Sequence, residues 1–136
     1  EALMAHAASL GLAERVRWYG ALAQPALVPL YQGARALAIP SREEGLGLVA
    51  VEAQLCGTPV VAYADGGLID VVRPEHGGTL VAVGDTRALG EALAQFLADE
   101  ASANERGMAA RDDMLARFSP EAVAGQYLSL YRQAVQ

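Results

Sequence analysis

The sequence predicts an α/β fold in which a parallel sheet lies between two layers of helices. Short apolar runs without polar alternation, such as residues 36–39 and 59–63, are typical of strands buried on both faces. Longer segments with apolar residues at helical spacing separate these runs, and this alternation is the pattern of a parallel sheet. The chain has 136 residues, of which 53% are hydrophobic, so it suits one domain with a buried core.

In the N-terminal segment, the spacing of apolar residues changes from that of a helix to that of a strand and then back to that of a helix. Residues 2–12 repeat apolar side chains at helical spacing and predict a helix. Polar and apolar residues then alternate over 15–19, and Gly20 follows as a turn, so a short strand is expected. A second helix is predicted over residues 25–34, because Pro25 suits a first turn, although Pro29 is unfavourable inside a helix.

The middle of the chain alternates strands and helices. The strand 36–39 is followed by a glycine-bearing loop and by the apolar segment 48–56, which is predicted to be helical because Gly57 and Pro59 follow it. Further strands are expected at 59–63 and 79–83, with a short helical turn between them at residues 68–72.

From Asp85 onward the sequence predicts helices only. Ser119 is well placed to cap the last of them. With no repeat or linker, the chain is expected to form one domain over residues 1–136, with a helical tail from about residue 85. The expected helices of this tail span residues 86–98, 101–118 and 120–134.

The composition excludes several classes of function. The ten basic residues are all arginines, against 16 acidic residues and a formal charge of −6, so a mechanism that depends on lysine is excluded. Nucleic acids and anionic lipids attract clustered Lys and Arg, and we expect neither as a partner. The single Cys56 cannot form an internal disulfide, and no apolar run approaches the about 20 residues of a membrane span. A cytoplasmic location is therefore expected.

The loop over residues 41–47 is the candidate ligand site. It follows the strand 36–39, and ligands of open parallel sheets bind beyond the carboxyl ends of the strands. Gly45 and Gly47 carry no side chain, so a ligand could approach the backbone there. The unpaired amides at the start of helix 48–56 favour an anion such as phosphate. We therefore predict an anion site that uses no lysine.

Glu52 is the one acidic side chain on an otherwise apolar helix and needs a polar partner. The hydroxyl pair of a ribose is one candidate, because a carboxylate can accept both hydroxyls. An ion pair with Arg73 or Arg42 is a purely structural alternative. Glu44, likewise, could serve only to stabilise the N-terminus of the following helix through its charge.

A continuous pattern connects these features: Pro40-Ser-Arg-Glu-Glu-Gly-Leu-Gly-Leu-Val-Ala-Val-Glu-Ala-Gln-Leu-Cys-Gly-Thr-Pro-Val-Val61. Together with its surroundings, residues 38–83, it resembles the donor-binding half of the retaining glycosyltransferases of family 4, also called group 1. That family carries two glutamates separated by seven residues, matched here by Glu44 and Glu52. Leu46 stands where the family usually has Phe.

The resemblance implies a GT-B enzyme whose C-terminal, Rossmann-like domain binds a nucleotide-diphosphate sugar and transfers its hexose with retention of configuration. Glu44, the catalytic candidate, would contact the sugar hydroxyls near the anomeric centre. Glu52 would take the ribose hydroxyls, and Gly20 would lie by the base. No metal or other cofactor is implied. The backbone contacts to the sugar and the β-phosphate would come from Gly45, Leu46, Gly47 and Leu48.

By the same resemblance, residues 1–136 form a partial nucleotide-sugar-binding domain. The family's domain begins with two strands ahead of helix 2–12, and the first of them carries the Arg and Lys that neutralise the diphosphate. In the strand order 3-2-1-4-5-6 the absent pair would be central, which leaves backbone groups unpaired. We expect an N-terminal acceptor domain of a longer parent, or a second copy, to complete the sheet, and the chain alone to be inactive. Membrane association of the parent stays open.

Two other functions remain open. A nucleotide-sugar 2-epimerase shares the GT-B architecture, although the two glutamates favour a transferase. A non-catalytic module for assembly or regulation is the other. Asp70 stands where the family commonly has Glu, and His6 and His76 lack metal-ligand spacing. Cys56 is expected to be a small buried residue and not a nucleophile.

Overall fold

The computed structural model describes residues 1–135 and contains a parallel sheet. Over these residues the sheet has three strands in the order β1-β2-β3, namely β1 (Leu37–Ile39), β2 (Val60–Tyr63) and β3 (Thr79–Val81). Leu37 pairs with Val60, and Val61 pairs with Thr79. In the described part of the chain, no strand pairs with the other edge of β1.

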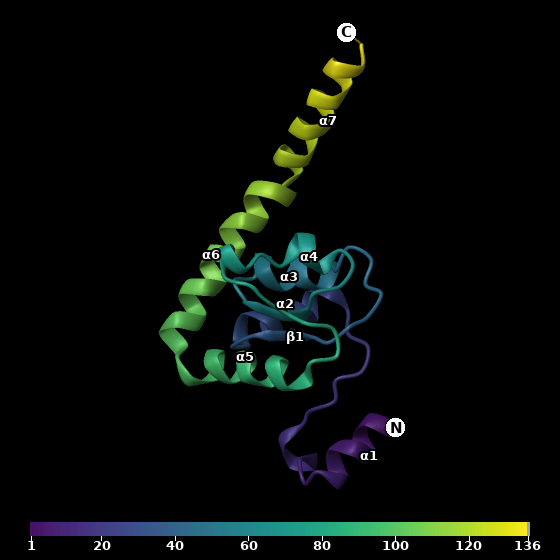
Figure 1. The fold of residues 1–136 in the computed structure, drawn as a ribbon, viewed down its shortest axis with the longest axis vertical. Helices are drawn as coiled ribbons and strands as arrows, with labels where there is room; N and C mark the ends of the chain where they lie inside the picture. The colour runs from purple at the N-terminus through teal and green to yellow at the C-terminus, as the bar shows by residue number, and fades with distance from the viewer. Residues whose placement is uncertain (136) are drawn as a thin grey trace.

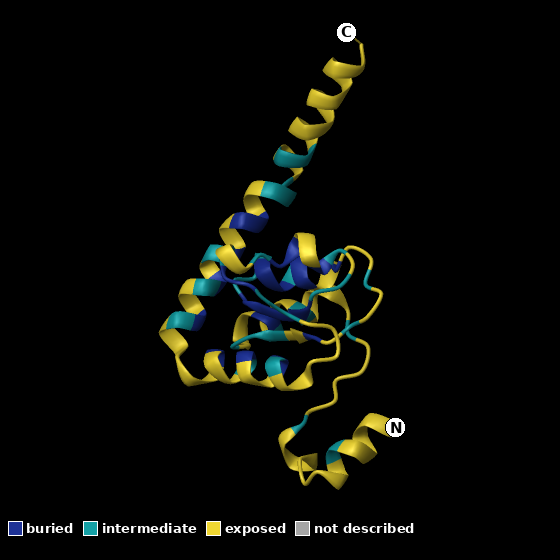
Figure 2. Ribbon diagram, in the orientation of Figure 1, coloured by how far each residue is buried: buried dark blue, intermediate teal, exposed yellow. Residues whose placement is uncertain are grey.

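Helices cover both faces of the sheet, as predicted (Figure 1). One face packs against α2 (Gln24–Gly33), α3 (Leu48–Leu55) and α4 (Leu68–Val71), and the other face packs against α5 (Thr86–Ala98). The side chains of β2 alternate between the two layers and are all buried, so β2 is the centre of the fold (Figure 2).

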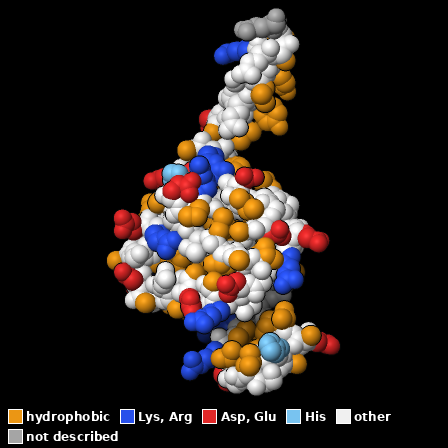
Figure 3. Space-filling view, in the orientation of Figure 1, with side chains coloured by type: hydrophobic (Ala, Val, Ile, Leu, Met, Phe, Trp, Pro, Cys, Tyr) orange, Lys and Arg blue, Asp and Glu red, His pale blue; other side chains and the backbone are white. Residues whose placement is uncertain are grey.

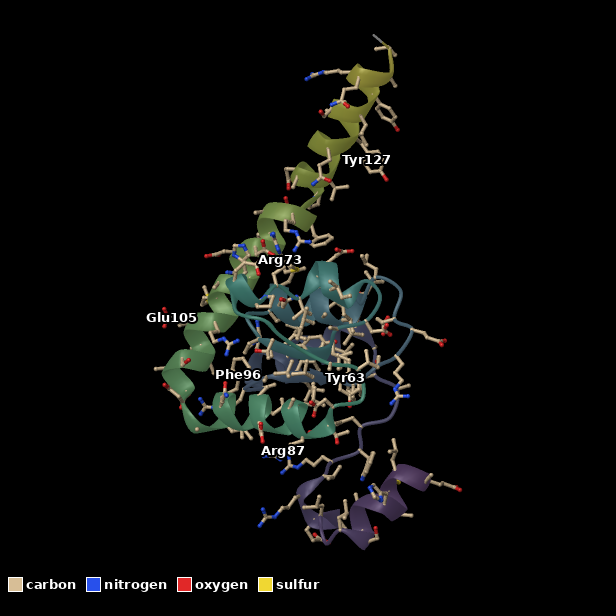
Figure 4. The ribbon with its side chains drawn as sticks, viewed as in Figure 1. Tyr63, Arg73, Arg87, Phe96, Glu105 and Tyr127 are labelled. Carbon is tan, nitrogen blue, oxygen red and sulfur yellow. The ribbon has the colours of Figure 1, made fainter. Side chains whose placement is uncertain are left out.

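The long helix α6 (Glu100–Phe118) contributes to both layers. Met114 packs with the α3 side of the core, whereas Ala103 packs with Phe96 and the α5 side. Arg106, between them, donates from Nη2 to the carbonyl oxygen of Gly78 at 2.9 Å. The helix therefore runs across the edge of the sheet and ties the two layers together (Figure 4).

The last helix, α7 (Pro120–Ala134), projects away from the body and buries no residue (Figure 1). Its start agrees with the prediction, because the Ser119 hydroxyl accepts a hydrogen bond from the amide of Ala122 at 3.2 Å. Asp85 and Asp99 cap α5 and α6 in the same way. Apolar side chains of α7 remain exposed (Figure 3). Among them are Tyr127 and Tyr131, whose ring centroids lie 6.3 Å apart with the rings tilted by 39°.

The strand predicted over residues 15–19 is wrong. Helix α1 (Ala2–Ser9) is followed by a 3-10 turn, η1 (Ala13–Arg15), and residues 16–20 are irregular. Alternating residues need a neighbouring strand for their backbone hydrogen bonds, and within the described residues none lies beside this segment. Trp18 and Tyr19 are accordingly exposed.

The other predicted elements are present with shifted ends. The first helix ends at Ser9 because Gly11 adopts φ +69° and stops it. Pro29 lies inside α2 and does not end it. The strands are shorter than predicted because only residues 37–39, 60–63 and 79–81 find partners. A 3-10 turn, η2 (Pro74–His76), lies between α4 and β3.

Candidate functional site

The glycine-rich loop over residues 43–47 rests on the turn that begins α4. The amide of Gly67 donates to the carbonyl oxygens of Glu44 at 3.2 Å and Gly45 at 2.7 Å. A Cβ atom at Gly66 would lie 1.9 Å from the Glu44 oxygen, and one at Gly67 would lie 2.0 Å from the Gly45 oxygen. Only glycines allow the two segments to approach this closely.

The loop turns sharply into α3 at Gly47. This residue adopts φ +77°, and a Cβ atom there would lie 2.8 Å from Cδ2 of Leu68, so glycine is required on both counts. Glu43 also has a positive φ of 60°, and its amide donates to the Asp65 carboxylate. Residues 65–68 therefore determine the path of the loop.

The backbone amides at the start of α3 have no acceptor among the described residues. Five successive amides, from Gly45 to Val49, donate no hydrogen bond within residues 1–135. Helix α3 is a full eight residues long, so its first turn presents unpaired N–H groups and a partial positive charge. The geometry is that of an anion site.

Glu44 lies at the edge of this group of amides. It is half-buried, and its carboxylate has no hydrogen-bond or ion-pair partner in the described part of the chain. The flanking side chains Leu46 and Leu48 are 50% and 63% exposed. Because neither the carboxylate nor these amides have a partner among the described residues, one ligand could contact both.

Glu52 follows four residues after Leu48, about 6 Å further along the helix axis. Its Oε2 accepts a hydrogen bond from the Tyr31 hydroxyl at 3.3 Å, and its Oε1 accepts one from Nε2 of Gln24 at 3.3 Å. The alternative ion pair is wrong, because neither Arg73 nor Arg42 pairs with Glu52 among residues 1–135. Helix α2 lies beside α3 and supplies neutral partners instead.

A cavity of about 170 Å³ lies between α2 and α3, beside the Glu52 carboxylate. Burial, followed by the charge of Glu52 and the hydrogen bond to it, raises the pKa of Tyr31 above the ordinary tyrosine value, so the phenol remains a donor. Cys56 is half-buried in this wall. The lining residues are Gln24, Leu27, Val28, Tyr31, Glu52, Leu55 and Cys56.

Gly20, predicted to lie by a base, is exposed in the irregular segment ahead of α2, with φ +66° and no neighbour within 4 Å of a Cβ position. It precedes Gln24 by four residues. Sequence reasoning missed Gln24 and Tyr31 as partners of Glu52. The only signal in the sequence was the four-residue spacing of Leu27 and Tyr31, which places both on one face of the predicted helix.

Sequence reasoning also missed a charged cluster on α6 that holds the segment after α4. The buried Asp113 accepts from Nη1 of Arg73 at 3.2 Å and from Nη1 of Arg117 at 2.9 Å, and Nε2 of His76 lies 3.7 Å away. Nη2 of Arg117 also donates to the carbonyl oxygen of Asp70 at 2.5 Å. The cluster fixes α4, and through α4 the turn on which the loop 43–47 rests (Figure 4, where Arg73 is labelled).

Among residues 1–135, no three His, Cys, Asp or Glu side chains are grouped so as to hold a metal ion. No helix in the same range combines the length and the apolar character needed to cross a membrane.

A parallel α/β sheet with a glycine-rich turn and a helix N-terminus at the carboxyl end of a strand is an arrangement in which many α/β domains bind phosphate-bearing ligands. The family described as "Glycosyl transferases group 1" matches residues 1–113. The chain therefore belongs to the group 1 glycosyltransferases, and the group 1 resemblance seen in the sequence is confirmed.

Relatives of this chain are glycosyltransferases from several bacteria. It is 42% identical over 130 residues to a D-inositol 3-phosphate glycosyltransferase of Mycobacterium avium (strain 104), an alignment that covers 93% of this chain and 30% of the relative. A protein of the same name from Salinispora tropica is 42% identical over 131 residues, covering 95% of this chain and 27% of the relative. The chain thus spans less than a third of the length of these relatives.

Solved structures share the fold. A sucrose-phosphate synthase from Thermosynechococcus elongatus superimposes with a TM-score of 0.87 and 40% identity, covering 98% of this chain and 33% of that one. The HepE protein of Anabaena, crystallised with UDP-glucose, gives a TM-score of 0.80 and 27% identity, covering 97% and 36%. These neighbours confirm the predicted GT-B type of α/β fold.

Proposed function

We propose that this chain is the donor-binding part of a retaining glycosyltransferase that transfers a hexose from a nucleotide-diphosphate sugar. The observation that carries the proposal is the row of unpaired amides from Gly45 to Val49, with a carboxylate on either side of it along the chain. The family membership, and a neighbour crystallised with UDP-glucose, support the same ligand class.

Each part of the site then has a role. The amides of residues 45–49 donate hydrogen bonds to the diphosphate and stabilise the charge that develops on it when the bond to the sugar breaks. Glu44 hydrogen-bonds the sugar hydroxyls near the anomeric centre, since its carboxylate has no partner of its own among the described residues. Glu52 accepts the ribose hydroxyls. None of these roles requires a metal ion, so binding should be the same in EDTA.

Calorimetry with UDP-glucose, GDP-glucose and ADP-glucose tests the proposal. One nucleotide sugar is expected to bind, and Glu52→Gln is expected to weaken it, because a neutral amide accepts hydroxyl hydrogen bonds less strongly than a carboxylate. The exposed Glu105→Gln is a matched control, since Glu105 lies on α6. A folded chain that binds no nucleotide sugar would overturn the proposal and favour a non-catalytic module.

The rest of a longer parent protein is proposed to complete the site. The free edge of β1 in the described residues offers unpaired backbone groups, and the chain covers less than a third of the length of its relatives. By the family resemblance, a strand paired there would also carry Arg and Lys side chains. These would add positive charge at a site to which this chain contributes no lysine. Light scattering separates this from pairing of two copies: a monomer at high concentration contradicts the second-copy version.

A further inference from the structure

Glu52 is held by two side chains of the neighbouring helix and still has acceptor capacity to spare. A carboxylate has about four lone-pair sites, and Tyr31 and Gln24 use one on each oxygen. Both hydrogen bonds measure 3.3 Å, which is long for these donors, so the carboxylate is oriented without being saturated. Shorter hydrogen bonds from ligand hydroxyls remain available on each oxygen.

The position of Tyr31 is itself rigid. Its side chain is 9% exposed and belongs to the core beneath α2 and α3. Its carbonyl oxygen accepts a hydrogen bond from the buried Thr58 hydroxyl at 2.5 Å. Tyr31 is therefore fixed at the ring and at the backbone, and its hydroxyl can orient Glu52 without moving itself.

The cavity beside Glu52 gives the carboxylate an open side. The other walls of this cavity are mainly the apolar side chains Leu27, Val28 and Leu55. A carboxylate among such neighbours gains most from donors with defined positions, because water there has few other partners. The arrangement suits a pair of hydroxyls approaching from the cavity.

We propose that Tyr31 and Gln24 are positioning residues that orient the Glu52 carboxylate to accept the ribose hydroxyls of the donor nucleotide. This inference rests on the proposed function of Glu52. Neither residue touches the ribose; each acts through Glu52 by limiting the rotation of its side chain. A purely structural role, in which the two donors only satisfy a half-buried carboxylate, makes a different prediction about ligand chemistry.

The test measures binding of UDP and of 2′-deoxy-UDP by calorimetry, with GDP and ADP and their 2′-deoxy forms if UDP does not bind. Tyr31→Phe removes one hydrogen bond and is expected to weaken the ribonucleotide about three- to tenfold, while the 2′-deoxynucleotide changes much less. The ratio of the affinities for the ribonucleotide and the 2′-deoxynucleotide, which measures the preference for ribose, therefore falls. A structural role weakens both ligands equally, and that result overturns the proposal, as does no change in either.

Three variants make the outcome decisive. Gln24→Ala tests the second donor at an exposed position, so it keeps the test valid if Tyr31→Phe unfolds the chain. Tyr127→Phe is the matched control, because Tyr127 is 57% exposed on α7. Glu52→Gln reports on the proposed function separately: if it weakens the ribonucleotide while Tyr31→Phe and Gln24→Ala do not, only the positioning role fails. If no nucleotide binds the wild-type chain, both proposals fail.

Discussion

The amide of Gly67 and the carbonyl oxygen of Gly45 form a 2.7 Å hydrogen bond that joins two segments 22 residues apart in the sequence. One segment is the candidate anion loop, and the other begins α4, which the Asp113 cluster anchors to α6. The shape of the loop is therefore set from outside the loop. Substitutions in α4 or α6 are therefore expected to alter the conformation of the loop through this hydrogen bond.

Gly67→Ala is expected to displace the loop and to destabilise the fold by more than about 1 kcal/mol, because the added methyl group would overlap the Gly45 carbonyl oxygen. Urea unfolding measures the loss, and calorimetry measures nucleotide affinity. Gly90→Ala is the control: nothing lies within 4 Å of its Cβ position, and it should stabilise α5 by about 0.5 to 1 kcal/mol. Equal unfolding midpoints for the two variants would contradict the close contact.

Gly45→Ala should separate binding from folding. No atom lies within 4 Å of a Cβ at this position, and its backbone is not in the left-handed region, so alanine fits without strain. The methyl group would nevertheless add bulk to a residue whose own amide is one of the five unpaired amides. We expect an unchanged urea midpoint and at least a tenfold loss of nucleotide affinity, about 1.4 kcal/mol. Undiminished affinity would place the ligand elsewhere.

Asp113→Asn tests the cluster on α6. The side chain is 6% exposed and carries the charge that two arginines face, so the neutral amide leaves them poorly compensated. A loss of about 1 to 3 kcal/mol in unfolding free energy is expected. Arg87→Ala, which breaks the exposed Arg87–Glu91 pair, should cost less than about 0.5 kcal/mol. If the cluster does not stabilise the fold, Asp113→Asn and Arg87→Ala should lower the free energy of unfolding by similar amounts.

Alkaline pH should weaken the fold through Tyr31. Burial first, and then the charge of Glu52, raises the pKa of Tyr31 above its ordinary value of 10.0. The unfolded chain therefore loses this proton at a lower pH than the folded chain. The stabilisation is complete below the unfolded value and is lost as pH rises through the folded value. Urea midpoints between about pH 8 and pH 11 should fall less steeply in Tyr31→Phe than in Tyr127→Phe.

Local patterns in the sequence were sufficient to predict most of the fold. Apolar runs predicted β1, β2 and β3, and caps such as Ser119 predicted the start of α7. The failure over residues 15–19 is physical: alternation predicts a strand only where another strand supplies hydrogen bonds, and none in the described chain does. A sequence segment does not contain its own pairing partner.

The residues of the candidate site were likewise predictable only in part. Gly45, Gly47 and Glu52 could be predicted because loop, helix start and carboxylate are consecutive in the chain. The partners of Glu52 could not, because they depend on how α2 crosses α3. The expectation that an arginine would neutralise Glu52 followed from charge alone, whereas the packed helices place Tyr31 and Gln24 there.

The candidate anion loop presents main-chain amides, and this has a consequence for how the proposed site can vary during evolution. Side chains at Leu46, Leu48 and Val49 point outward and are at least 50% exposed, so they can be exchanged without removing a single donor. Substitution by proline, which lacks the N–H, is the direct way to delete a donor from this row. The proposed anion site would thus be encoded mainly by glycine positions and helix geometry, and it should persist in descendants whose surface residues have diverged widely.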